Sequence, residues 1–130
     1  MYIKSAIALV FALLLVPLQV QALGLGKLQT SSVLNQPFEG EIELLSLAEG
    51  ELDTVKVALA SEEAFSRVNV DRPFLLSRLK FETVQKPDGK SVVRVYSNRP
   101  ISEPYLNFLI EVNWPKGQII REFSVLLDVR

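Results

Sequence analysis

The segment from Tyr105 to Asp128 constrains the fold more than any other part of the chain. It consists of two runs in which apolar and polar residues alternate, joined at Trp114-Pro115-Lys116-Gly117. One parity of the first run holds Leu106, Phe108, Ile110, Val112 and Trp114, and one parity of the second holds Ile119, Arg121, Phe123, Val125 and Leu127. Only Leu109 breaks the pattern of the first run. Alternation with a period of two around a Pro/Gly turn predicts a half-buried antiparallel hairpin.

The rest of the chain is divided into similar short segments by turn-forming residues. We expect strands at 27–34, 38–47, 54–61, 74–86 and 91–98 ahead of the closing hairpin. A short helix is expected at 62–69, because Ser61 is a good N-cap and the acidic Glu62 and Glu63 suit a helix start. About seven strands with turns every ten residues or so predict an all-β fold, an antiparallel Ig-like β-sandwich with one short helix.

The first 22 residues have the pattern of a secretory signal peptide. Lys4 precedes an unbroken apolar run from Ala6 to Leu15, and small residues stand at the positions that a signal peptidase reads. We therefore predict cleavage between Ala22 and Leu23, export to the periplasm, and a mature β-domain over 23–130. The alternative is a retained inner-membrane anchor facing the periplasm, since no charge occurs between Lys4 and Lys27.

Charge and composition exclude several classes of function. The chain carries 14 basic and 15 acidic residues; without Lys4 the balance is 13 to 15, a net charge of −2. Such a balance argues against nucleic acid and against electrostatic adhesion to anionic lipid. The chain has no histidine and no cysteine, which removes Ser-His-Asp and Cys-His nucleophiles and nearly all zinc sites.

The carboxylates do not predict a catalytic or metal site. Glu39, Glu41 and Glu43 share one parity of a predicted strand, which is typical of a solvated sheet face rather than of a glycosidase acid pair. The acidic stretch 49–53 lacks the spaced oxygen ligands of a calcium loop. A Ser–Lys pair stays open, although no serine is distinguished. We expect no catalytic residues, no cofactor, no metal, and a protein that is not an enzyme.

The hairpin residues are interpreted as structural. Trp114, the sole tryptophan, is expected to be a largely buried anchor beside Pro115 rather than an exposed aromatic for a partner or glycan. Asn107 and Asn113 are expected to bond neighbouring backbone.

Four segments together resemble a known family. They are Leu34 to Asp53, Val57 to Phe74, Val93 to Gly117 and Arg121 to Asp128. In this order they resemble the N-terminal periplasmic domain of the FimV/HubP family. The most specific block is LNFLIEVNWP, and its signature residues are Asn107, Phe108, Glu111, Asn113, Trp114 and Pro115.

The resemblance implies a polar landmark protein that supports type IV pilus assembly and twitching motility. We therefore expect a non-catalytic periplasmic interaction domain whose partner is a periplasmic protein, with the pilus or polar assembly as the candidate source of that partner. The family's peptidoglycan-binding LysM module lies outside these 130 residues, so no direct peptidoglycan binding is expected. The alternative is a chaperone-like or pilin-like module that exchanges a strand. Docking is expected at a loop end or at a sheet edge, such as the first strand from Leu28 to Leu34.

Overall fold

The computed structural model describes residues 23–47 and 50–129. The predicted signal peptide, residues 1–22, lies outside the described residues, so cleavage between Ala22 and Leu23 stays a prediction. In the part of the chain that is described, no helix combines the length and apolarity needed to cross a bilayer.

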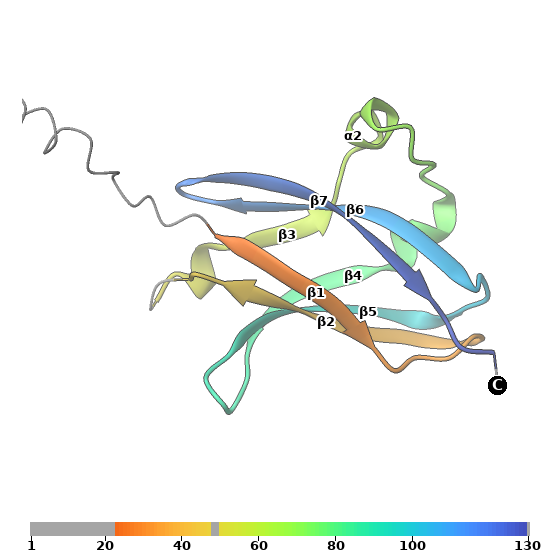
Figure 1. Ribbon diagram of the computed structural model, residues 1–130, viewed down its shortest axis with the longest axis horizontal. Helices are drawn as coiled ribbons and strands as arrows, with labels where there is room; N and C mark the ends of the chain where they lie inside the picture. The colour runs from red at the N-terminus through yellow and green to blue at the C-terminus, as the bar shows by residue number, and fades with distance from the viewer. Residues whose placement is uncertain (1–22, 48–49, 130) are drawn as a thin grey trace, which may run out of the picture.

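Within the described residues, seven strands form two antiparallel sheets that face each other (Figure 1). The strands are β1 (Gly24–Thr30), β2 (Gln36–Leu45), β3 (Lys56–Leu59), β4 (Lys80–Gln85), β5 (Ser91–Ile101), β6 (Tyr105–Trp114) and β7 (Gly117–Leu126). One sheet has the order β1-β2-β5-β4 and the other β3-β6-β7. This is the strand arrangement of a constant-type immunoglobulin domain. The predicted Ig-like sandwich is therefore confirmed.

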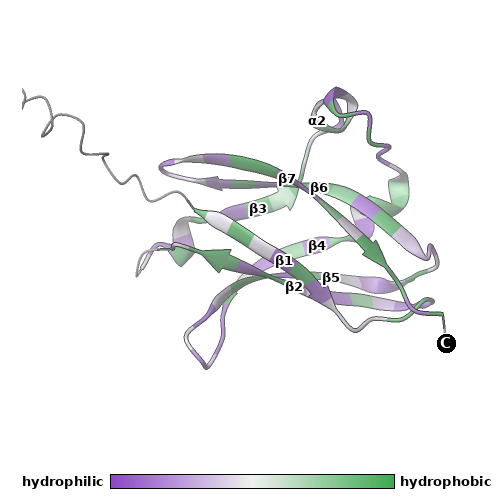
Figure 2. Ribbon diagram, in the orientation of Figure 1, coloured by the Kyte–Doolittle hydropathy of each residue, from purple (hydrophilic) through white to green (hydrophobic). Residues whose placement is uncertain are grey.

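The hydrophobic core lies between the two sheets and draws on both. Hydrophobic and hydrophilic positions alternate along several strands, as period-two burial requires (Figure 2). Phe38 and Ile42 of β2 are buried against Phe108 and Ile110 of β6 within one continuous cluster. The predicted closing hairpin is confirmed, and its register runs from Trp114 opposite Gly117 to Tyr105 opposite Leu126.

The first strand begins earlier than the sequence predicted. The first strand was expected at 27–34, yet β1 begins at Gly24 and pairs with β2 from there. Gly26 lies close to β2: a Cβ at this position would be 3.3 Å from the Cβ of Glu43, which is a tight contact. The register also shifts between Leu25 and Leu28, so β1 carries a bulge-like irregularity.

Three short helical segments complete the domain: η1 (Leu52–Thr54), α2 (Glu62–Arg67) and η2 (Phe74–Arg78). The predicted N-cap is confirmed, because the Ala64 N–H donates to Ser61 Oγ at 3.2 Å. The expected strand at 74–86 is wrong in its first half. Pro73 precedes a 3-10 helix there, in which the Leu76 side chain is buried, and the buried Leu79 follows directly after the helix.

Candidate functional site

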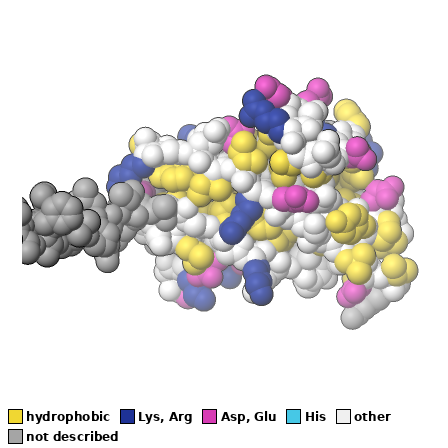
Figure 3. Space-filling view, turned by 45° about the horizontal axis from the view of Figure 1, so that its top comes forward, with side chains coloured by type: hydrophobic (Ala, Val, Ile, Leu, Met, Phe, Trp, Pro, Cys, Tyr) yellow, Lys and Arg dark blue, Asp and Glu magenta, His cyan; other side chains and the backbone are white. Residues whose placement is uncertain are grey.

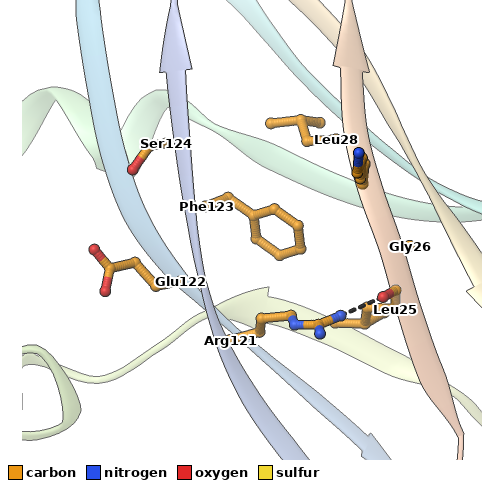
Figure 4. A pocket seen from close by; sticks show the side chains of 8 residues that line it. Leu25, Gly26, Leu28, Arg121, Glu122, Phe123 and Ser124 are labelled. Carbon is orange, nitrogen blue, oxygen red and sulfur yellow. Dashed lines mark hydrogen bonds between the residues drawn. The ribbon is translucent and has the colours of Figure 1, made fainter.

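A groove separates β1 from β7 along one side of the sandwich. Each sheet ends there, because β1 pairs only with β2 and β7 only with β6. The groove has a volume of about 460 Å³ and combines the apolar Leu25, Leu28 and Phe123 with the charged Lys27, Arg121 and Glu122. Figure 4 shows the side chains that line it. Apolar surface beside open strand edges is the environment in which an extended peptide can dock.

Phe123 forms the apolar floor of this groove. Its side chain points from β7 toward β1, beside Leu28, whereas Glu122 and Ser124 point away (Figure 4). Phe123 is 8% exposed, and its ring centroid lies 6.2 Å from that of Phe108 on β6. A ring that is anchored in the core and still reaches the groove gives a rigid apolar contact surface.

Arg121 bridges the two sheets across the groove. Its guanidinium Nη1 donates a hydrogen bond to the backbone carbonyl of Leu25 (Figure 4). Guanidinium has five N–H donors, so this bond leaves others free to face a ligand. The β1 carbonyl that Arg121 binds is thereby already occupied.

The backbone of β7 offers a regular free edge. In an antiparallel ladder, hydrogen-bonded and non-hydrogen-bonded pairs alternate. Trp114 and Gly117 close the two-residue turn, so Ile120, Glu122 and Ser124 direct their N–H and C=O groups away from β6. The β6–β7 pairing shows no register shift, unlike β1. Of the two edges, β7 is the longer and more regular template for an added strand.

The chain just after β7 is paired with the chain that follows β1, so the free edge of β7 ends there. The Leu34 N–H donates to the Asp128 carbonyl at 2.8 Å, and Val33 and Asp128 form a parallel bridge. The expected docking edge at Leu28 to Leu34 is therefore divided. Its first part lies in the bulged β1, and its last residue is tied to the chain after β7.

The predicted signature residues lie along the β6–β7 hairpin and do not converge on a cleft. Asn107 Oδ1 accepts a hydrogen bond from Ser124 Oγ at 3.1 Å, and Asn113 donates to Glu111 at 3.2 Å. Both asparagines thus bond side chains, where backbone partners were expected. Gln118 also donates to Glu111. These bonds connect neighbouring positions on the outer face of the hairpin.

Three other signature residues have different surroundings. Phe108 is fully buried. Trp114 is partly buried: it packs against the edge of the core, as expected of an anchor, and lies over Gly117, where a Cβ would be 3.5 Å from its ring. Pro115 is exposed in the turn. The Trp114 ring therefore covers the backbone at the turn end of the hairpin.

Two of the β2 carboxylates, Glu39 and Glu41, form ion pairs with cations that lie on or next to other strands of the same sheet. Glu39 binds Arg94 of β5 at 2.7 Å, and Arg94 also reaches Glu82 of β4 at 3.3 Å. Glu41 binds Lys86 at 3.0 Å. The hydrogen bond that Lys86 donates to Glu41 raises the pKa of Lys86, and the hydrogen bonds that Arg94 donates to Glu39 raise the pKa of Arg94. Among residues 23–47 and 50–129, no cluster of acidic side chains is arranged to hold a metal ion.

The topology defines an immunoglobulin-like domain in which the edge strands β1 and β7 flank a groove with an apolar floor, and β7 is the more regular of the two edges. A family model described as the FimV N-terminal domain, an Ig-like domain, matches residues 23–130. The chain belongs to the FimV N-terminal domain family, and the resemblance stated from its sequence is confirmed.

Two curated relatives are similar over most of this chain. Motility hub protein FimV of Pseudomonas aeruginosa strain PAO1 is 53% identical over 106 residues, which is 82% of this chain and 12% of the relative. The same figures hold for Motility hub protein FimV of strain UCBPP-PA14. The solved BIgI domain of beta protein from S. agalactiae, bound to CEACAM1, aligns with a TM-score of 0.42 and 8% identity. That alignment covers 84% of this chain and 97% of that domain.

Proposed function

We propose that the chain supplies a non-catalytic, periplasmic protein-interaction domain that acts in a motility assembly linked to type IV pili. The observation that carries this proposal is the free edge of β7 beside the groove. A partner strand would bond the outward backbone groups of β7 and place an apolar side chain over Phe123. Family membership supports the biological context, through relatives named as a motility hub protein.

The strand-exchange alternative is less well supported. A pilin-like domain that takes a donor strand needs a core that lacks one of its own strands. Here the domain supplies seven strands itself, and its own Phe123 and Val125 fill the inner positions of β7. An added strand would extend the three-stranded sheet without replacing a core strand.

The test removes a single outward donor from the edge. Proline at position 122 deletes an N–H that points away from β6, so Glu122→Pro leaves the β6–β7 ladder intact. We expect loss of twitching motility and of surface pili when this variant replaces the chromosomal copy. Glu122→Gln is the control, because it changes the side chain and keeps the backbone donor. Normal motility with Glu122→Pro, at wild-type protein level, would contradict docking at β7.

A further inference from the structure

A second hollow lies at the opposite edge of the four-stranded sheet from β1. It forms where η2, the start of β4 and the end of β5 meet, and has a volume of about 240 Å³. Its lining residues are Phe74, Ser77, Arg78, Lys80, Asn98 and Arg99. We call it the basic aromatic pocket. It shares no lining residue with the groove between β1 and β7.

Phe74 projects from this pocket into solvent. It is 83% exposed, the highest value among the large hydrophobic side chains of the described residues. Local structure causes this: residues three apart eclipse in a 3-10 helix, so Phe74 and Ser77 share the pocket side of η2. The Ser77 hydroxyl donates to the Phe74 carbonyl at 2.6 Å. Leu76 points the other way and is buried, which fixes the segment and leaves the phenyl ring outside.

The charged lining of the pocket has one sign. Arg78, Lys80 and Arg99 contribute three cations, and none of the six lining residues is acidic. None of the three forms an ion pair within residues 23–47 and 50–129. The nearest acidic residue along β4 is Glu82, which binds Arg94 instead.

We propose that the basic aromatic pocket binds an acidic peptide segment of a partner protein, with an apolar side chain of that segment packed on Phe74. Guanidinium groups bind carboxylates through paired hydrogen bonds. Arg78 and Arg99 both line the pocket, and so does the exposed ring of Phe74. Asn98 adds an amide. An aromatic anchor surrounded by arginines is the composition of protein interface hot spots.

Two further observations favour a peptide over an anionic membrane. Residues 23–130 carry a net charge of −2, so the domain as a whole is repelled by an anionic surface while the pocket attracts a local acidic group. In addition, Lys80 begins β4, the last strand of its sheet. An extended segment beside Lys80 therefore also meets strand-edge backbone groups, which a lipid headgroup cannot pair in register.

The experiment titrates the full chain with a synthetic peptide of alternating aspartate and leucine residues, followed by NMR. We expect amide shifts confined to η2, the start of β4 and the end of β5, and affinity that falls as salt rises. The triple variant Arg78→Gln, Lys80→Gln, Arg99→Gln should weaken binding at least tenfold. Phe74→Ser should weaken it about fivefold, because it removes an exposed apolar contact that folding does not use.

The matched control is Lys56→Gln, Lys90→Gln, Lys116→Gln, which removes three exposed cations that line neither the groove nor the basic aromatic pocket and should leave affinity unchanged. An asparagine–leucine peptide should not bind. The proposal is overturned if the two triple variants lose affinity equally. It is also overturned if phosphatidylglycerol vesicles bind the wild type more tightly than the peptide does, or if inorganic phosphate reproduces the same shifts. Because Glu122→Pro leaves this pocket intact, failure here is distinguishable from failure of docking at β7.

Discussion

At the scale of single residues, Arg94 connects three strands of one sheet. Its guanidinium binds Glu39 of β2 and Glu82 of β4 while its own strand, β5, lies between them. The same group stacks on Tyr96, with its carbon 4.0 Å from the ring centroid. Exposed ion pairs contribute little free energy individually. The ion pairs of Arg94 instead determine which side chains of β2, β5 and β4 lie next to each other on the outer surface of the sheet.

The Lys86–Glu41 pair gives a prediction about protonation. The hydrogen bond and charge of Glu41 raise the pKa of Lys86 from its ordinary 10.5. Glu41→Gln should lower this pKa, and Glu43→Gln, which removes only a weaker coulombic contribution, should lower it less. The measurement is an NMR titration of the Lys86 side chain. Equal pKa values in both variants would show that the hydrogen bond to Glu41 does not form in solution.

The same pair predicts a direction for stability against pH. Because folding raises the pKa of Lys86, the folded state holds this proton more tightly than the unfolded state does. The resulting stabilisation is complete below pH 10.5 and is lost as the pH rises through the folded-state pKa. In Glu41→Gln this alkaline loss should be smaller.

At the scale of elements, the pairing of β1 with β2 includes a glycine, Gly40, at a point of close contact. A Cβ at Gly40 would lie 3.1 Å from Leu28 Cδ1 and 3.2 Å from the carbonyl oxygen of Gln29. The backbone carbonyl cannot move without disturbing the ladder, so Gly40→Ala should cost about 1–3 kcal/mol of unfolding free energy. Urea denaturation measures this. Gly117→Ala is the control, because its added Cβ would make ordinary contacts of 3.5 Å or more, and it should cost less.

Elements with a strong local pattern could be predicted from the sequence, and elements set by distant contacts could not. The β6–β7 hairpin follows from alternation around Pro115, and α2 follows from the Ser61 cap. The start of β1 was missed because its glycines indicate flexibility, although they serve close approach to β2. At 74–78 the apolar residues fit a strand, but tertiary packing of Leu76 and Leu79 selects a 3-10 helix.

The candidate binding surfaces were beyond sequence reasoning for a related reason. The groove joins residues near position 25 to residues near 121, and the basic aromatic pocket joins 74–80 to 98–99. No local spacing relates these segments. Only the strand order, in which β1 and β7 end two different sheets on the same side, brings the groove residues together. Because Phe74 was predicted to lie in a strand, its sequence position did not indicate that its side chain would be exposed.

At the scale of the whole molecule, one core serves both sheets, so we predict a single unfolding transition. Trp114, at the edge of that core, reports on the hairpin by fluorescence, whereas far-UV circular dichroism reports on all strands. In urea the two curves should coincide. Phe108→Ala, at a fully buried position, should shift both together and cost about 3–5 kcal/mol.

The control for this prediction is Tyr105→Ala on the same strand. Its side chain is 56% exposed, so the loss should stay below about 1 kcal/mol. A fluorescence transition at lower urea than the circular dichroism transition would show that the hairpin unfolds separately from the rest.

The parallel bridge between Val33 and Asp128 has a mechanical consequence. Hydrophobic side chains gather at the right-hand end of the molecule in Figure 3. The described part of the chain starts at one end of the molecule and finishes at the other (Figure 1). Tension applied between Leu23 and Val129 would run along the strands, so the Leu34–Asp128 hydrogen bond and the β1–β2 ladder would be loaded in shear. Bonds loaded in shear share the force and break together, whereas a ladder pulled from one end opens one bond at a time. A domain with this geometry resists stretching along its long axis.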